Sequence, residues 1–171
     1  MRRRPFPVEH DAYYRTYIEA VPDGDIMDIL VRECSRTVDF LSGIPEEKAD
    51  WSYSEGKWSV AEVIGHIVDT ERVFSYRAMR MARGDKTPLA SMDQDEFVNG
   101  ANFNARKLDS LAREFQFMRS ANIELFESFS DSDLDRRGIA SGMEFTVRAL
   151  VYITAGHAIH HVRVLHERYG L

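Results

Sequence analysis

The chain has 171 residues, of which 44% are hydrophobic and 29% are charged, and its net charge is −6. This length suits one domain, spanning residues 1–171. The acidic balance argues against a nucleic-acid partner, and the basic run Arg2-Arg3-Arg4 is too short for a binding arm. The single cysteine, Cys34, excludes an intrachain disulfide and is expected to pack inertly in the core. No apolar run reaches the roughly 18 residues of a membrane span, and no signal peptide is visible, so we expect a cytoplasmic protein without a membrane partner.

The first 23 residues form a segment rich in proline and tyrosine. Its prolines exclude a long helix, but a short helix over residues 10–20, with its aromatic side chains packed on the domain, is compatible with the pattern. Apolar residues at helical spacing predict a helix from residue 24 or 25 to residue 41. Residues 45–57 are polar, with Trp51 and Tyr53 inserted, and are expected to form an anchored loop.

The sequence Ser59-Val-Ala-Glu62 is a capping box, which predicts the start of a helix that continues to about Arg83. Glu71 falls inside the apolar stripe of this helix, which is unusual for a carboxylate. A buried ion pair with Arg77 or with an arginine from another helix is the preferred interpretation, and a catalytic role is the alternative.

A further helical stretch is expected over residues 93–129, with a break near residues 99–104. Residues 139–143 indicate a turn or a small hairpin before a last helix over residues 146–169. Four long amphipathic helices predict an all-α fold, an antiparallel or partly crossed four-helix bundle with a short extra helix or extended segment at the N-terminus.

Two histidines on the last helix, His157 and His161, are the strongest sign of chemistry. They are four residues apart, so their side chains lie on one helical face, and that face coincides with the apolar stripe. One buried histidine is usually satisfied by a hydrogen bond, but a shared metal ion satisfies two at once. His160 and His166 lie at the edge of the stripe and off it, and are expected to be exposed or to support the ligands.

An open catalytic zinc site takes three protein ligands, and His66 is the leading candidate for the third because it lies within a long, largely apolar helical pattern. Two motifs carry a resemblance at this point: Lys57-Trp-Ser-Val-Ala-Glu-Val-Ile-Gly-His66-Ile-Val-Asp-Thr-Glu-Arg72 and Gly156-His-Ala-Ile-His-His161. Together with Arg4-Pro5, the tyrosine-rich segment, Tyr76-Arg-Ala-Met-Arg80 and Arg83-Gly-Asp85, they make nearly the whole chain similar to the DinB/YfiT-like superfamily.

The resemblance implies a four-helix bundle that holds a divalent ion, zinc or nickel, on His66, His157 and His161, and it implies homodimers. This chain has Ala158 where relatives often carry a polar or acidic residue, which puts in doubt an acid/base or supporting role at that position.

Three neutral imidazoles leave a bound ion its full charge, so the site could activate water for hydrolysis or a low-molecular-weight thiol for transfer. Relatives are described as thiol-dependent S-transferases and isomerases or as metal-dependent hydrolases, and both enzyme classes imply a small-molecule substrate. A non-catalytic or stress-related protein with a structural metal is the alternative. Three histidines without a cysteine partner favour the open, catalytic kind of site.

Overall fold

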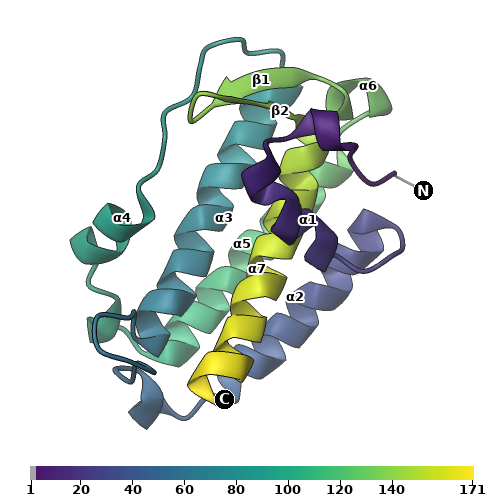
Figure 1. Ribbon diagram of the computed structural model, residues 1–171. Helices are drawn as coiled ribbons and strands as arrows, with labels where there is room; N and C mark the ends of the chain where they lie inside the picture. The colour runs from purple at the N-terminus through teal and green to yellow at the C-terminus, as the bar shows by residue number, and fades with distance from the viewer. Residues whose placement is uncertain (1–2) are drawn as a thin grey trace.

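Four long helices form a bundle in the computed structural model, which describes residues 3–171 (Figure 1). Met1 and Arg2, which belongs to the basic run at the N-terminus, lie outside the described residues. The long helices are α2 (Ile26–Ser42), α3 (Val60–Ala82), α5 (Leu108–Glu127) and α7 (Val147–Tyr169). The shorter elements are α1 (Arg15–Ala20), α4 (Gln94–Gly100), α6 (Asp131–Leu134), β1 (Arg137–Ala140), β2 (Met143–Thr146) and 3₁₀ turns at Pro7–Glu9, Ala12–Tyr14, Glu46–Lys48 and Phe103–Ala105. The prediction of an all-α bundle is confirmed.

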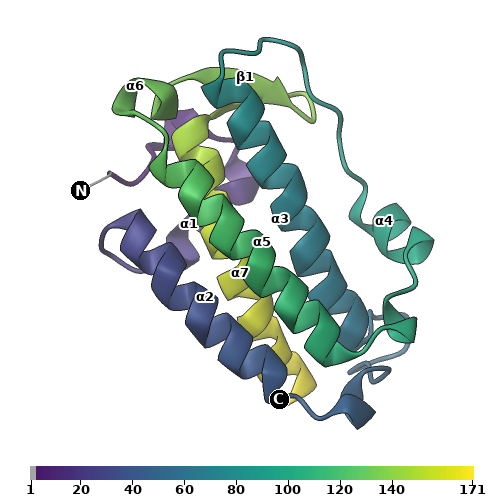
Figure 2. The same cartoon turned by 180° about the vertical axis from the view of Figure 1, so that it is seen from behind.

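The connections of the bundle are crossed. Helix α2 packs against α5, α3 packs against both α5 and α7, and α7 also contacts α2. The two views place α2 and α3 at opposite corners, although they follow one another in the chain (Figures 1 and 2). Helices α3 and α5 run in the same direction, so the segment between them, which carries α4, returns along the outside of the bundle (Figure 1). This crossing makes α3 and α7 direct, antiparallel neighbours.

Local sequence signals explain where the two helices that carry the candidate histidines begin and end. The capping box of α3 is present: the Ser59 hydroxyl accepts from the Glu62 amide at 3.2 Å, and the Glu62 carboxylate accepts from the Ser59 amide at 2.7 Å. Thr146 caps α7 by accepting from the Ala149 amide, and Gly170 ends the helix in the left-handed conformation (φ 66°).

The structure also defines the predicted N-terminal helix, the hairpin and the loop over residues 45–57 more closely. The expected helix over residues 10–20 is divided into a 3₁₀ turn and α1, and Tyr14 and Ile18 from this segment are buried. The possible hairpin is confirmed as β1 and β2, joined by Ser141 and Gly142, whose positive φ values of 54° and 75° suit a tight two-residue turn. The loop over residues 45–57 includes one 3₁₀ turn.

The core consists of two apolar clusters, one toward the hairpin end and one toward the C-terminal end of α7. Phe74 and Ala155 belong to the first cluster, and Val68, Phe115 and Ala158 belong to the second. On α3 and α7 the residues between the two clusters include the buried polar side chains of Glu71 and His157, so a polar layer separates the clusters partway along the bundle. No helix in residues 3–171 combines the length and the apolar character that a membrane span requires.

Candidate metal centre

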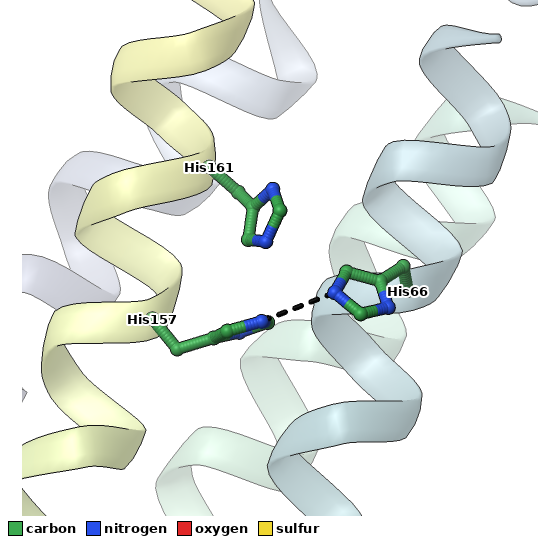
Figure 3. Close-up of side chains that lie close together, drawn as sticks. All are labelled: His66, His157 and His161. Atoms are coloured by element: carbon green, nitrogen blue, oxygen red, sulfur yellow. Dashed lines mark hydrogen bonds between the residues drawn. The ribbon is translucent and has the colours of Figure 1, made fainter. Parts of the chain in front are cut away.

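The three predicted histidines meet between α3 and α7 (Figure 3). His66 comes from α3, and His157 and His161 come from successive turns of α7. A glycine precedes His66 and another precedes His157, and each allows a neighbouring segment to approach closely. A Cβ on Gly65 would lie 2.3 Å from the Phe103 ring, and a Cβ on Gly156 would lie 1.8 Å from the carbonyl oxygen of Tyr17. These contacts hold both histidine-bearing turns against their surroundings.

The ring nitrogens are close enough to share one ligand. His66 Nε2 and His157 Nε2 are 3.1 Å apart, and one donor nitrogen from each of the three histidines lies within 4.8 Å of the others. The ring centroids of His161 lie 4.8 Å from His66 and 4.4 Å from His157. Nitrogen ligands at about 2.0–2.1 Å from one tetrahedral ion lie only a little over 3 Å from each other, so this spacing fits a shared ion.

Neighbouring side chains fix the orientation of the rings. The Thr70 hydroxyl, one turn after His66, lies 3.3 Å from His66 Nδ1, which leaves Nε2 to face α7. The Trp58 ring packs at 4.7 Å from the His66 ring. Tyr17 and Phe74 meet the His157 ring edge-on at 5.3 and 5.8 Å. A hydrogen bond to the second ring nitrogen and packing around the ring both help to orient histidines that bind a metal.

Burial makes all three imidazoles weak bases. His66 and His157 are 3% and 4% exposed, whereas His161 is partly exposed. Burial lowers the pKa of His66 to about 4 and, together with the positive charge that His66 and His160 would carry if protonated, lowers the pKa of His161 to about 3. The pKa of His157 is also lowered, first by burial and then by its histidine neighbours. Neutral imidazoles are the form that binds a metal ion, so the donor set fits a divalent cation of the zinc type.

Two cavities reach this cluster. The larger, of about 550 Å³, is lined by His66 and His157 together with aromatic side chains of the N-terminal segment. A second, of about 380 Å³, is lined by His161, Trp58 and Tyr53. Both cavities share Gln94 and Asp95, at the start of α4. The histidines therefore lie at the inner wall of a space large enough for a small molecule.

The other predicted residues lie around this centre. His160 is half-buried, with its ring 5.1 Å from that of His161, and His166 is exposed. Ala158 is buried in the apolar core. No local sequence pattern marks Tyr17 or Trp58 as part of the site, because only the packing of their segments on α7 and α3 brings them to the histidines.

Glu71 has the buried arginine partner that the sequence predicted, but the partner is Arg119 of α5 and not Arg77. Arg119 Nε and Nη2 donate to the two Glu71 oxygens, both at 2.6 Å, and Asn122 donates to Oε1 at 3.1 Å. Glu71 is not among the residues that line either cavity. These contacts favour a structural role, and the catalytic role stays an untested prediction.

Fold and site together define a class: helical bundles that hold three histidine nitrogens around one point in their core. The model of the DinB superfamily matches residues 29–165, so the chain belongs to the DinB superfamily. A Bacillus mycoides (strain KBAB4) protein named as a candidate metal-dependent hydrolase is 23% identical over 164 residues, covering 94% of this chain and 92% of that protein.

Two solved structures share the fold. YfiT from Bacillus subtilis, described as a probable metal-dependent hydrolase with an unusual four-helix bundle topology, superimposes with a TM-score of 0.69 at 15% identity, over 98% of this chain and 94% of YfiT. A mycothiol-dependent maleylpyruvate isomerase superimposes with a TM-score of 0.67 at 15% identity, over 85% of this chain and 61% of the isomerase. At this identity the likeness establishes the shared bundle.

Proposed function

We propose that this protein is a metal-dependent enzyme that acts on a small molecule and binds one divalent cation, zinc or nickel, through His66, His157 and His161. The observation that carries the proposal is the convergence of three imidazoles, two buried and one partly exposed, beside two cavities. The names of the Bacillus mycoides relative and of YfiT support the same chemistry. We further propose a homodimer, which the family resemblance implies and which sedimentation analysis would test.

The chain contributes position and environment. Thr70 and Trp58 hold the His66 ring, and Tyr17 holds the His157 ring, so that the donor nitrogens face one point. Apolar burial keeps the rings unprotonated at neutral pH and limits the access of bulk water. A divalent ion bound by three neutral ligands keeps its full charge and would lower the pKa of a water or thiol placed beside it, so that a nucleophile becomes available near neutral pH.

Hydrolysis and thiol transfer are both compatible with this environment. One observation favours transfer as a second candidate: two cavities reach the histidines, one beside His66 and His157 and the other beside His161. A transfer needs room for a thiol and for a second reactant, and this arrangement offers separate places for them. The mycothiol-dependent isomerase shows that the bundle also occurs in a thiol-dependent protein.

The first experiment measures metal content. Protein purified without chelator should carry about one divalent ion per chain, and His157→Ala or His161→Ala should lose most of it. His160→Ala is the matched control, because its ring lies beside His161 but outside the cluster, and it should retain the ion. Wild-type protein that contains no metal and takes up none from added zinc or nickel would refute the proposal.

Two further measurements separate the alternatives. Melting with and without chelator distinguishes a catalytic ion from a structural one, since a structural ion is needed for folding and its removal should unfold the bundle. Cobalt-substituted protein titrated with glutathione or another low-molecular-weight thiol should then show a thiolate charge-transfer band if the enzyme is a transferase. A retained fold without such a band favours hydrolysis.

A further inference from the structure

A buried arginine lines the same large cavity as the histidines. Arg77 follows His66 by three helical turns on the same helix, which places its Cα about 16 Å further along the α3 axis. Its side chain is only 3% exposed, yet it contributes to the wall of the cavity that His66 and His157 also line. The cavity therefore has a potential cation site and a fixed cation at different positions along α3.

Arg77 differs from the other buried arginines in its partners. Arg119 pairs with Glu71, and Arg148 donates to the Asp135 carboxylate at 2.7 Å. By contrast, Arg77 Nη2 donates to two neutral acceptors, the Ala90 carbonyl oxygen at 2.6 Å and the Ser141 hydroxyl at 3.0 Å. The Tyr14 hydroxyl, also neutral, is its remaining polar neighbour.

No carboxylate within residues 3–171 forms an ion pair with the Arg77 guanidinium. Burial lowers the pKa of this group, but a guanidinium stays charged at neutral pH. A buried charge without a counterion is costly, and proteins seldom retain one unless a ligand supplies the opposite charge. The Ala90 and Ser141 contacts use only one of the three guanidinium nitrogens, and the Tyr14 hydroxyl that also hydrogen-bonds the group carries no charge.

We propose that Arg77 binds the carboxylate of a small organic acid that occupies this cavity, and that the apolar or aromatic body of this acid extends toward the three histidines. The position of the reacting end rests on the function proposed above, whereas the recognition of the acid does not. Tyr14, Tyr17 and Phe74 line the space between the two ends, and their rings suit an apolar body.

Acidic side chains at the rim restrict the ligand to one buried anionic group. Asp93 and Asp95 line the cavity but are exposed, and the Asp93 carboxylate already accepts from the amides of Asp95 and Glu96 at 3.0 Å. Neither aspartate forms an ion pair with Arg77, and their negative charges disfavour a ligand that carries a second carboxylate near the opening. Arg77 also joins the loop at Ala90 to the hairpin at Ser141, so a test must separate binding from this structural role.

The test uses metal-free wild-type protein, prepared with chelator, and two probes that differ in charge: 4-phenylbutyrate and 4-phenylbutyramide. Arg77 is the lysine or arginine side chain among the residues that line this cavity, so it provides the fixed positive charge of the wall. Calorimetric titration should show that the acid binds at least about tenfold more tightly than the amide, as a charge-assisted bond to a buried guanidinium predicts. Equal affinities, or no binding of the acid, would overturn the proposal.

Variants assign the preference to Arg77. Arg77→Gln should remove the preference for the acid, and Arg77→Lys should retain part of it because the charge remains but the planar fork is lost. Arg113→Gln, on α5, changes the net charge equally at an exposed ion pair with Asp109 and should bind the acid as the wild type does. Ser141→Ala removes one structural contact of Arg77 but leaves its charge in place, so this variant should also keep the preference for the acid over the amide.

The outcomes distinguish this proposal from the metal proposal. Retained acid preference in a folded Arg77→Gln variant overturns the role of Arg77, whatever the metal content. If Arg77→Gln does not fold, the proposal is still tested by the wild type and by Ser141→Ala, both of which should bind the acid more tightly than the amide. Zinc titration of the same samples reports independently on the histidines, so loss of metal binding with intact acid preference would refute only the function proposed above.

Discussion

The buried pair of Glu71 and Arg119 allows a sharp test of whether the carboxylate is structural or catalytic. We consider Glu71→Gln, which keeps the shape of the side chain but removes its charge. Arg119 is 0% exposed, its Nη1 has no hydrogen-bond partner among the described residues, and its other polar contact is the Thr154 carbonyl oxygen at 3.4 Å. The substitution therefore leaves a buried cation whose hydrogen-bond partners are neutral, with Glu33 as its remaining carboxylate neighbour.

Removing one partner of a buried ion pair typically costs about 3–5 kcal/mol. This is a large share of the roughly 5–15 kcal/mol by which a domain is stable. The double variant Glu71→Gln/Arg119→Met removes both charges, so it should be more stable than Glu71→Gln alone. Asp109→Asn at the exposed pair with Arg113 is the control, with an expected cost below about 1 kcal/mol.

Urea denaturation followed by circular dichroism, with and without chelator, measures these free energies. The structural reasoning is refuted if Glu71→Gln unfolds within about 1 kcal/mol of the wild type. If that stable variant also retains its metal but loses turnover, Glu71 is the catalytic carboxylate that the sequence left open. Metal content of the same samples separates loss of the site from loss of the fold.

Three further predictions concern the histidines and the glycine before one of them. Because a metal ion binds the neutral ring, and the pKa values of His66 and His161 are about 4 and about 3, protons should displace the ion only below about pH 5. Dialysis from pH 8 to pH 4 with metal analysis checks this, and a midpoint near pH 6.5 contradicts it. Metal-free protein should lose stability as the pH falls from about 6.5 to 4, because the unfolded chain then binds more protons than the folded protein. His66 alone should lower the free energy of unfolding by about 2 kcal/mol at pH 5, relative to neutral pH. Urea denaturation measures this loss, and a flat pH profile would contradict the prediction. Gly156→Ala should lower the free energy of unfolding by about 3 kcal/mol or more, because the added Cβ would collide with the Tyr17 carbonyl oxygen. Gly100→Ala is the control and should be nearly neutral, because the space around its Cβ is open. Equal melting temperatures of the two variants would count against the close packing of α1 on α7.

The sequence predicted the parts of the site that depend on local periodicity. His157 and His161 share a helical face at any position of that helix in the fold, and the capping box at Ser59 marks the start of α3 whatever packs against it. The choice of His66 came from its apolar setting and from the family pattern. Its approach to within 3.1 Å of His157 depends on the crossed connections, which place α3 beside α7.

The parts that were missed depend on contacts between distant segments. Spacing on α3 alone could not decide between Arg77 and an arginine of another helix as the partner of Glu71, because the choice is made by the parallel packing of α5 on α3. Arg77 then remains without a carboxylate, and no pattern in its own helix reveals this. Tyr17 is placed by the close approach of α1 at Gly156, which again is a contact between segments.

The buried polar groups form one layer across the bundle. Arg119 of α5 donates hydrogen bonds both to Glu71 of α3 and to the Thr154 carbonyl of α7, between the two apolar clusters. Apolar side chains of similar size are often at least as stabilising as a buried ion pair, so net stability is a poor reason for this layer. What a directional network adds is register: a slip of α7 by one turn, about 5.4 Å, would break its bonds and would also carry His157 away from His66. The ion pair would therefore fix the relative heights of the helices that carry His66 and His157, in addition to the electrostatic effect of Arg119 on His157.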